Sequence, residues 1–143
     1  GDGKADVIWR HKTDGYNAIW LMNGSNITSR YTFNRVANLS WTIVGSGDLN
    51  GDGTDDIIWR NQSSGSNVAY LLENGQIKSS QSINTVANLN WQIADISDLN
   101  GDGKADLFWR NTSGEIVIYL MDGASISSRG SIGAIPTNWQ VIH

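Results

Sequence analysis

The chain has 143 residues, a formal net charge of −4 and a hydrophobic content of 39%, with seven tryptophans. This length and composition predict one folded domain with a packed core, and they argue against a disordered chain. The absence of cysteine excludes disulfide bonds, and the absence of a basic stripe argues against a nucleic-acid partner. No apolar run is long enough to cross a bilayer, so we expect no membrane insertion.

A unit of about fifty residues recurs along the chain, which predicts a repeat architecture. Each copy contains a Trp-Arg pair, a further aromatic residue in the next hydrophobic segment, and an isolated Trp before the following unit. The pairs are Trp9-Arg10, Trp59-Arg60 and Trp109-Arg110, the further aromatics are Trp20, Tyr70 and Tyr119, and the isolated tryptophans are Trp41, Trp91 and Trp139.

Each unit reads as four short strands, which in one complete unit fall at about 91–97, 104–110, 115–121 and 125–132. Val, Ile, Trp and Tyr dominate these segments, and Gly, Asn, Ser and Asp separate them. No segment shows sustained helical periodicity. Four antiparallel strands in a unit of this length are typical of a β-propeller blade, whereas the alternative β-helix has much shorter coils.

We therefore predict an all-β fold of four-stranded antiparallel propeller blades in one segment over residues 1–143. The first unit starts inside a loop and therefore has only its second to fourth strands, while a lone first strand ends the chain. Three blades' worth of strands are thus present, permuted by one strand. The chain starts without Met, and we expect that its natural N-terminus is absent. The segment divides into a partial blade over 1–36, whole blades over 37–86 and 87–135, and a lone first strand over 136–143.

Two modes of completion remain open, because propellers usually contain about four to eight blades and three do not close comfortably. The chain is either a piece of a longer propeller or one half of an assembly. In the second case two chains would join head to tail in a six-bladed ring, and each would donate residues 139–143 to the other's incomplete blade.

A loop of nine residues is repeated in full, over 48–56 and 98–106. It places acid or amide groups at positions 1, 3, 5 and 9 and a backbone carbonyl at position 7, which are the hard oxygen donors that Ca²⁺ prefers. An incomplete copy at the start of the chain is expected to bind weakly. The candidate ligands are Asp48, Asn50, Asp52, Thr54 and Asp56 in one loop, Asp98, Asn100, Asp102, Lys104 and Asp106 in the other, and Asp2, Lys4 and Asp6 in the incomplete copy.

The rival interpretations of this loop are weaker. Asp in a Gly-rich turn can bond its own backbone without a metal, but two complete copies favour calcium. An EF-hand is excluded because position 12 would be Glu, whereas it is Trp59 or Trp109 here, and because β-prone residues rather than a helix precede that Trp. Magnesium is less suitable because it prefers few carboxylates and keeps its waters.

The runs from Trp41 to Arg60 and from Trp91 to Arg110 resemble the FG-GAP or VCBS repeat family, whose best-known relatives are the integrin α-chain propellers. The resemblance extends over the whole chain. It implies a β-propeller in which the calcium loop joins the first two strands of each blade. The Phe-Gly and Gly-Ala-Pro pairs that give the family its name are not clearly present, so the resemblance does not extend to integrin-like ligand recognition.

The leading functional prediction is a non-catalytic, calcium-stabilised module of a secreted or surface protein, with a glycan or a surface protein as its partner. Such loops need more calcium than the cytosol holds, which favours an extracellular location reached by bacterial export. Catalysis is not expected, because His11 and His143 occupy unrelated repeat positions and the carboxylates belong to the loops. The alternative is an assembly domain with no ligand beyond calcium and its own copies.

The repeated aromatic and arginine residues each have two interpretations. One aromatic at the same register in each strand is typical of blade packing, which we favour over stacking against a sugar ring. The arginines that follow the tryptophans are expected to bond backbone carbonyls or a neighbouring blade, rather than to line a groove for anionic ligands.

Overall fold

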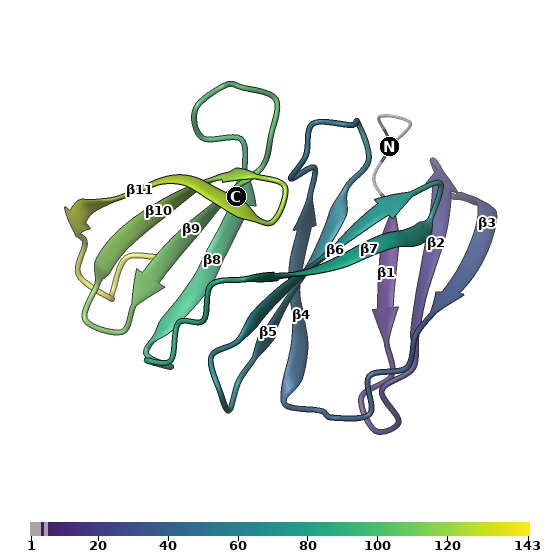
Figure 1. The fold of residues 1–143 in the computed structure, drawn as a ribbon, viewed down its shortest axis with the longest axis horizontal. Helices are drawn as coiled ribbons and strands as arrows, with labels where there is room; N and C mark the ends of the chain where they lie inside the picture. Colours follow the sequence, from purple (N-terminus) through teal and green to yellow (C-terminus); the bar gives the residue numbers. More distant parts are fainter. Residues whose placement is uncertain (1–3, 5) are drawn as a thin grey trace.

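The computed structural model describes residue 4 and residues 6–143, which form three antiparallel β-sheets and no helix. The sheets stand side by side in an open arc (Figure 1), and we call them blades 1, 2 and 3 in chain order. Blade 1 contains β1 (Val7–Arg10), β2 (Asn17–Asn23) and β3 (Asn26–Phe33). Blade 2 contains β4 (Trp41–Gly47), β5 (Asp56–Asn61), β6 (Asn67–Glu73) and β7 (Gln76–Ile83). Blade 3 contains β8 (Trp91–Ser97), β9 (Asp106–Asn111), β10 (Glu115–Asp122) and β11 (Ser125–Ala134).

The strands of each blade lie in chain order and pair antiparallel with their neighbours. Blades 2 and 3 use the same register, with Trp41 opposite Asn61 and Trp91 opposite Asn111. In blade 1, β1 corresponds to a second strand, so one of its edges has no partner strand among the described residues. The prediction of an all-β fold with propeller-like blades is confirmed, and the arc formed by the described residues does not close into a ring.

Three details differ from the predicted strands. In blade 3 the second strand begins at Asp106 rather than at 104, because the loop continues through 105, and the fourth strand extends to Ala134. Residues 136–143, predicted to contain a lone first strand, form no strand. A strand needs a hydrogen-bonded neighbour, and no described strand of this chain pairs with that segment.

The hydrophobic core lies between the blades. Side chains along a strand point alternately to opposite faces, so Ile57 packs toward blade 1 while Ile58 packs toward blade 3. Trp59 fills the interface between blades 1 and 2, and Trp109 fills the interface between blades 2 and 3; each is 1% exposed. Burying one such side chain stabilises the fold by roughly 1.5–3 kcal/mol, so blade stacking is the main source of stability.

A glycine turn fixes the linker that leaves each blade. In all three blades this glycine has a positive φ, between +72° and +94°, and its carbonyl accepts the N–H of a linker residue at 2.9 Å. A Cβ at this position would collide with the carbonyl oxygen of the same linker residue, so only glycine fits. The three pairs are Gly15 with Val36, Gly65 with Val86, and Gly114 with Ile135.

No helix that could span a membrane is found in the part of the chain that the structure describes.

Candidate calcium loops and blade interfaces

The two complete loops join the first and second strands of blades 2 and 3 and rise from the same end of the molecule (Figure 1). The loop of blade 2 is anchored on blade 3, because Ala105 donates its N–H to the Asp48 carbonyl at 2.6 Å and Gly123 donates to the Leu49 carbonyl at 2.8 Å. Leu49 is consequently fully buried, whereas its counterpart Leu99 is 42% exposed. A loop is therefore held in place by the blade that follows it.

The carboxylate at position 1 organises each loop by accepting backbone N–H groups. Asp48 accepts from Gly51 at 2.8 Å and Asp52 at 3.1 Å through Oδ1, and from Gly53 at 2.8 Å through Oδ2. The same three bonds recur around Asp98. In that loop the N–H of Gly103, followed by the other N–H groups, holds the pKa of the Asp98 carboxyl below its usual range.

The side chains at positions 3 and 5 lean toward each other. Asn50 donates its Nδ2 to Asp52 Oδ2 at 3.1 Å and accepts the N–H of Asp52 at 2.9 Å, while Asp52 Oδ1 accepts the N–H of Thr54 at 2.8 Å. The second loop repeats these bonds at 3.2, 3.0 and 2.9 Å. Both loops thus share one hydrogen-bond pattern around the same oxygen donors.

The carboxylate at position 9 lies at the base of the loop and is fully buried. Asp56 accepts the N–H of Leu49 at 3.0 Å and that of Leu72 at 2.9 Å, and so ties the loop to the third strand of its own blade. Burial raises the pKa of Asp56 to about 6, and the two N–H groups act in the opposite direction. This clamp was not foreseen in the sequence, although the recurrence of Asp at this position as Asp6 offered a signal.

The same clamp is present in blade 3, and one of its two bonds recurs in blade 1. Asp106 accepts the N–H of Leu99 and that of Met121, each at 2.9 Å. Asp6 accepts the N–H of Met22 at 3.0 Å. In the incomplete loop Asp2 lies outside the described residues.

The donor set of the complete loops fits calcium. Among the described residues, no three His, Cys, Asp or Glu side chains by themselves form a metal-holding group, so amide and carbonyl oxygens would have to complete each site. Oδ1 of Asp48 accepts two N–H groups, but Oδ2 accepts only one and retains a second lone pair, so these hydrogen bonds do not exclude a cation. At position 7 only the backbone carbonyl of Lys104 could be a ligand, because its ammonium has no lone pair; the ammonium bonds Asp122 Oδ1 at 2.7 Å.

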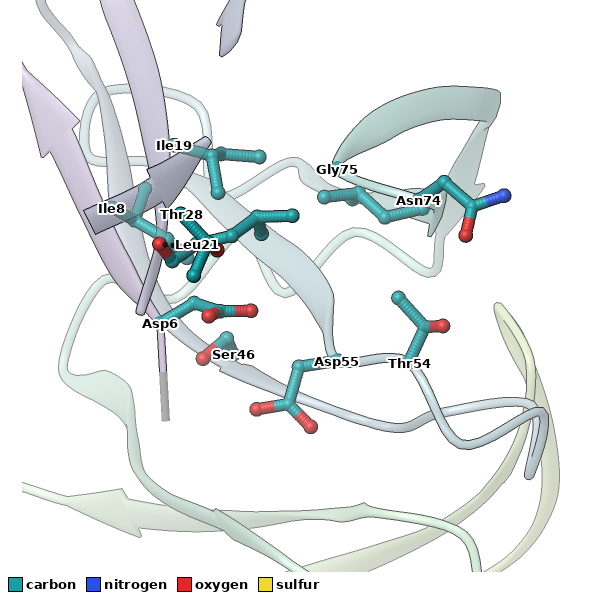
Figure 2. A pocket seen from close by; sticks show the side chains of 11 residues that line it. Asp6, Ile8, Ile19, Leu21, Thr28, Ser46, Thr54, Asp55, Asn74 and Gly75 are labelled. Carbon is teal, nitrogen blue, oxygen red and sulfur yellow. Dashed lines mark hydrogen bonds between the residues drawn. The ribbon is translucent and has the colours of Figure 1, made fainter. Parts of the chain in front are cut away.

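An acidic cavity of about 200 Å³ lies between blades 1 and 2 (Figure 2). The carboxylates of Asp6 and Asp55 surround it together with the Ser46 hydroxyl. Burial raises the pKa of Asp55, and the charges of Asp48 and Asp6 raise it further. At the next interface Ala105 replaces Asp55 and is buried close to Gly47 of the first strand β4. The cavity therefore lies where blade 1 has no first strand among the described residues.

Two of the repeated arginines, Arg10 and Arg60, connect neighbouring blades, and Arg110 bonds carbonyls of the segment after its own blade. Arg60 is fully buried; it donates to the carbonyls of Gly65 and Val86 at 3.1 Å each and to that of Trp91 at 2.9 Å. Its guanidinium also lies 5.0 Å from the ring centre of Trp109 in the next blade. Arg10 lies over Trp59 in the same way, at 4.9 Å. These arginines have a structural role, as favoured from the sequence, and the buried Trp59 and Trp109 are core residues.

The comparisons with known proteins agree with this architecture. A family model described as the FG-GAP-like repeat matches residues 1–59 and 48–109, which together cover more than half of the chain. Searches of curated proteins and of solved structures gave no significant match. Each matched segment begins in one copy of the loop and ends at the Trp that follows the next copy, so it contains one full repeat. The chain therefore belongs to the FG-GAP-like repeat family.

Proposed function

We propose that this chain is a non-catalytic, calcium-binding β-propeller module of a secreted or surface protein, and that it serves adhesion or glycan binding. The observation that carries the calcium part is the identical hydrogen-bond pattern of the two loops around Asp48, Asn50 and Asp52 and around their counterparts. Membership of a family of repeats typical of extracellular and surface proteins supports the location. The calcium concentration that such loops require supports it further.

Calcium would act on stability rather than on chemistry. The first loop gathers the carboxylates of Asp48, Asp52 and Asp56, and the pKa of Asp56 is raised first by burial and further by the charges of the other two. A bound ion would neutralise this repulsion and fix the connection between β4 and β5. Because it would bind the folded state only, it would stabilise that state by about 2.7 kcal/mol at one hundred times the dissociation constant.

The calcium part is tested by thermal melting in calcium and in EDTA. We expect calcium to raise the melting temperature, and we expect Asp102→Asn to reduce this increase because the variant loses one charged ligand. Glu115→Gln is the matched control, since Glu115 is an exposed acid outside both loops and its loss should leave the calcium response unchanged. Equal melting temperatures with and without calcium would refute this part of the proposal.

A repeated aromatic cavity supports the glycan part. Blades 2 and 3 each contain one, of about 250 and 380 Å³. The indole N–H groups of Trp59 and Trp109, which line these cavities, are buried without a hydrogen-bond partner in the structure. Because those two rings are almost fully buried, a sugar would stack its apolar face on the half-buried ring of Trp41 or Trp91, which lines the same cavity. The cavities are lined by Val36, Trp41, Trp59, Val68, Tyr70 and Ser80 in blade 2, and by the corresponding residues of blade 3.

A glycan array probed with the intact chain in calcium tests this part. We expect binding that Trp91→Leu weakens, because Trp91 lines the cavity of blade 3 and is only half-buried. Leu89→Ser is the control, since Leu89 lies nearby in the linker but does not line that cavity. An array without any specific signal would refute the glycan function and leave calcium binding untouched.

The second candidate function is an assembly domain that completes a propeller by association with its own copies. The observation that favours it is the exposure of large hydrophobic residues on the two outer blade faces, among them Trp9 and Trp139. Light scattering of the purified chain distinguishes it from the first candidate, because an assembly domain forms a defined oligomer without any glycan.

A further inference from the structure

We propose that a second copy of this chain docks head to tail, with Trp9 of one copy inserted into the groove between blade 3 and residues 135–141 of the other. This inference rests on the assembly function above and names its partner and its contacts. Two such junctions close two chains into a six-bladed ring.

The two internal interfaces show what a completed junction contains. In each, a tryptophan of the following blade is almost fully buried under the arginine of the preceding blade. Around Trp109 these groups are Arg60, Ile58, Val86 and Trp91. Around Trp59 the corresponding groups are Arg10, Ile8, Val36 and Trp41. The same five positions therefore build both junctions.

The outer face of blade 3 presents this environment without its tryptophan. A groove of about 380 Å³ is lined there by Phe108, Arg110, Ile135 and Trp139. These residues occupy the repeat positions of Ile58, Arg60, Val86 and Trp91. The groove is therefore the counterpart of the site that holds Trp109 at the internal interface.

The outer face of blade 1 presents the missing tryptophan. Trp9 is 48% exposed, whereas its counterparts Trp59 and Trp109 are 1% exposed. Its ring contacts Trp20 of its own blade at 4.9 Å between ring centres, as Trp109 contacts Tyr119 at 5.5 Å. Trp9 is therefore held against its own blade on one side, and its exposed side is free to enter the groove on the outer face of blade 3.

A second pair of positions follows the same rule. Ile132 of the last blade is 61% exposed, although its counterpart Ile83 is buried in the interface between blades 2 and 3. At the first interface the corresponding residue, Phe33, meets the ring of Tyr70 edge-on at 6.3 Å. In the assembly Ile132 meets Trp20 of the partner, which stands at the position of Tyr70.

The segment after blade 3 is held by the same hydrogen bonds that precede a first strand in the other blades. Arg110 donates to the carbonyl of Trp139 at 2.6 Å, just as Arg60 donates to the carbonyl of Trp91 at the start of β8. The linker N–H of Ile135 is held by Gly114 at 2.9 Å, as in the other blades. Residues 139–143 are thus held at the end of blade 3 by the same bonds that hold the start of β8 at the end of blade 2.

The free edge of β1 is the place for these residues. By the register of Trp91 opposite Asn111, Trp139 of one copy pairs with His11 of the other, and Gln140 pairs with Arg10. No strand among the described residues pairs with that edge, and a free edge can accept an added strand.

Two copies, rather than another number, satisfy the geometry of closed propellers. Each copy contributes three blades' worth of strands, so two copies give six blades, within the usual range of about four to eight, whereas three copies exceed it. A heterologous junction of this kind forms a ring when the rotation closes. Because both outer faces use the positions of the internal junctions, the partner that fits them is this chain itself.

Solution mass and a directed cross-link test the inference together. Light scattering of the intact chain should give twice the chain mass of 15.6 kDa. Trp9→Ser should weaken the dimer on the order of 30-fold, as loss of a central aromatic anchor does. Leu89→Ser is the control, because Leu89 is 39% exposed but belongs to a linker between internal blades. This variant should leave the mass unchanged.

The cross-link uses exposed positions that do not pack in the core. Gln62 donates its N–H to the Ser40 carbonyl at 2.7 Å, and Thr112 donates to the Asn90 carbonyl at 3.0 Å. The corresponding residues at the junction are Lys12 and Asn138. A chain with Lys12→Cys mixed with a chain with Asn138→Cys should therefore form a covalent pair on oxidation. Lys12→Cys mixed with Asn90→Cys is the control and should not.

The outcomes separate this inference from the calcium proposal. A single species of 15.6 kDa at every concentration, without the specific cross-link, overturns the inference even if calcium raises the melting temperature. An oligomer larger than a dimer overturns the six-bladed ring. A cross-linkable dimer whose melting temperature is the same in calcium and EDTA supports the inference and refutes the calcium proposal.

Discussion

Replacing Asp56 with alanine would separate the structural role of this carboxylate from its proposed role as a calcium ligand. The side chain is fully buried, and its two oxygens accept the N–H groups of Leu49 and Leu72. Alanine leaves both donors without a partner in a dry environment. Each unsatisfied buried donor costs about 1–3 kcal/mol, so we expect the free energy of unfolding to fall by about 2–6 kcal/mol.

The assay is urea unfolding in EDTA, so that no calcium contributes to the difference. Asp52→Ala is the matched control, because Asp52 is exposed and its oxygens accept only from groups of its own loop. We expect the free energy of unfolding of this control to fall by less than about 1 kcal/mol in EDTA. In calcium the decrease should be larger, because the variant also loses a calcium ligand. Equal losses for the two variants in EDTA would refute the clamp that we assign to Asp56.

Three further predictions concern the blade interfaces. Arg60→Lys should lower the free energy of unfolding by about 3 kcal/mol in urea titrations, because one ammonium cannot reach all the carbonyls that the guanidinium bonds. Gly65→Ala should cost more than Gly53→Ala in thermal melts, since both have positive φ but only Gly65 would place a Cβ against Val86; equal losses would contradict this. Asp55→Ala should raise the melting temperature slightly, because it removes a carboxylate that is repelled by Asp48 and Asp6. A lower melting temperature for this variant would contradict the prediction.

The repeat, the strands and the loops could be predicted because each is encoded within one unit. The spacing of Asp48, Asn50 and Asp52 sets the loop, and the consecutive hydrophobic residues 57–59 indicate a strand buried on both faces. These signals are local, and their recurrence in a second copy distinguishes the loop from an ordinary Asp turn. For the same reason the strand limits in blade 3 differed from the prediction by only a few residues.

The remaining features depend on the neighbouring blade and are not visible in one unit. Leu49 and Leu99 occupy the same loop position, yet only Leu49 is buried, because blade 3 covers it. Residues 139–143 have the sequence of a first strand but form none, because a strand needs a partner. The two hydrogen bonds that Asp56 accepts could not be predicted for a different reason. A carboxylate at position 9 can serve equally well as a metal ligand and as an acceptor for backbone N–H groups.

Equilibrium dialysis against calcium, with the bound metal measured per chain, tests the central claim most directly. The account predicts saturation at two ions per chain, one for each complete loop, with Asp52→Asn and Asp102→Asn each weakening one of them. Binding of no calcium at millimolar concentration, by a chain that is folded by circular dichroism, would contradict it.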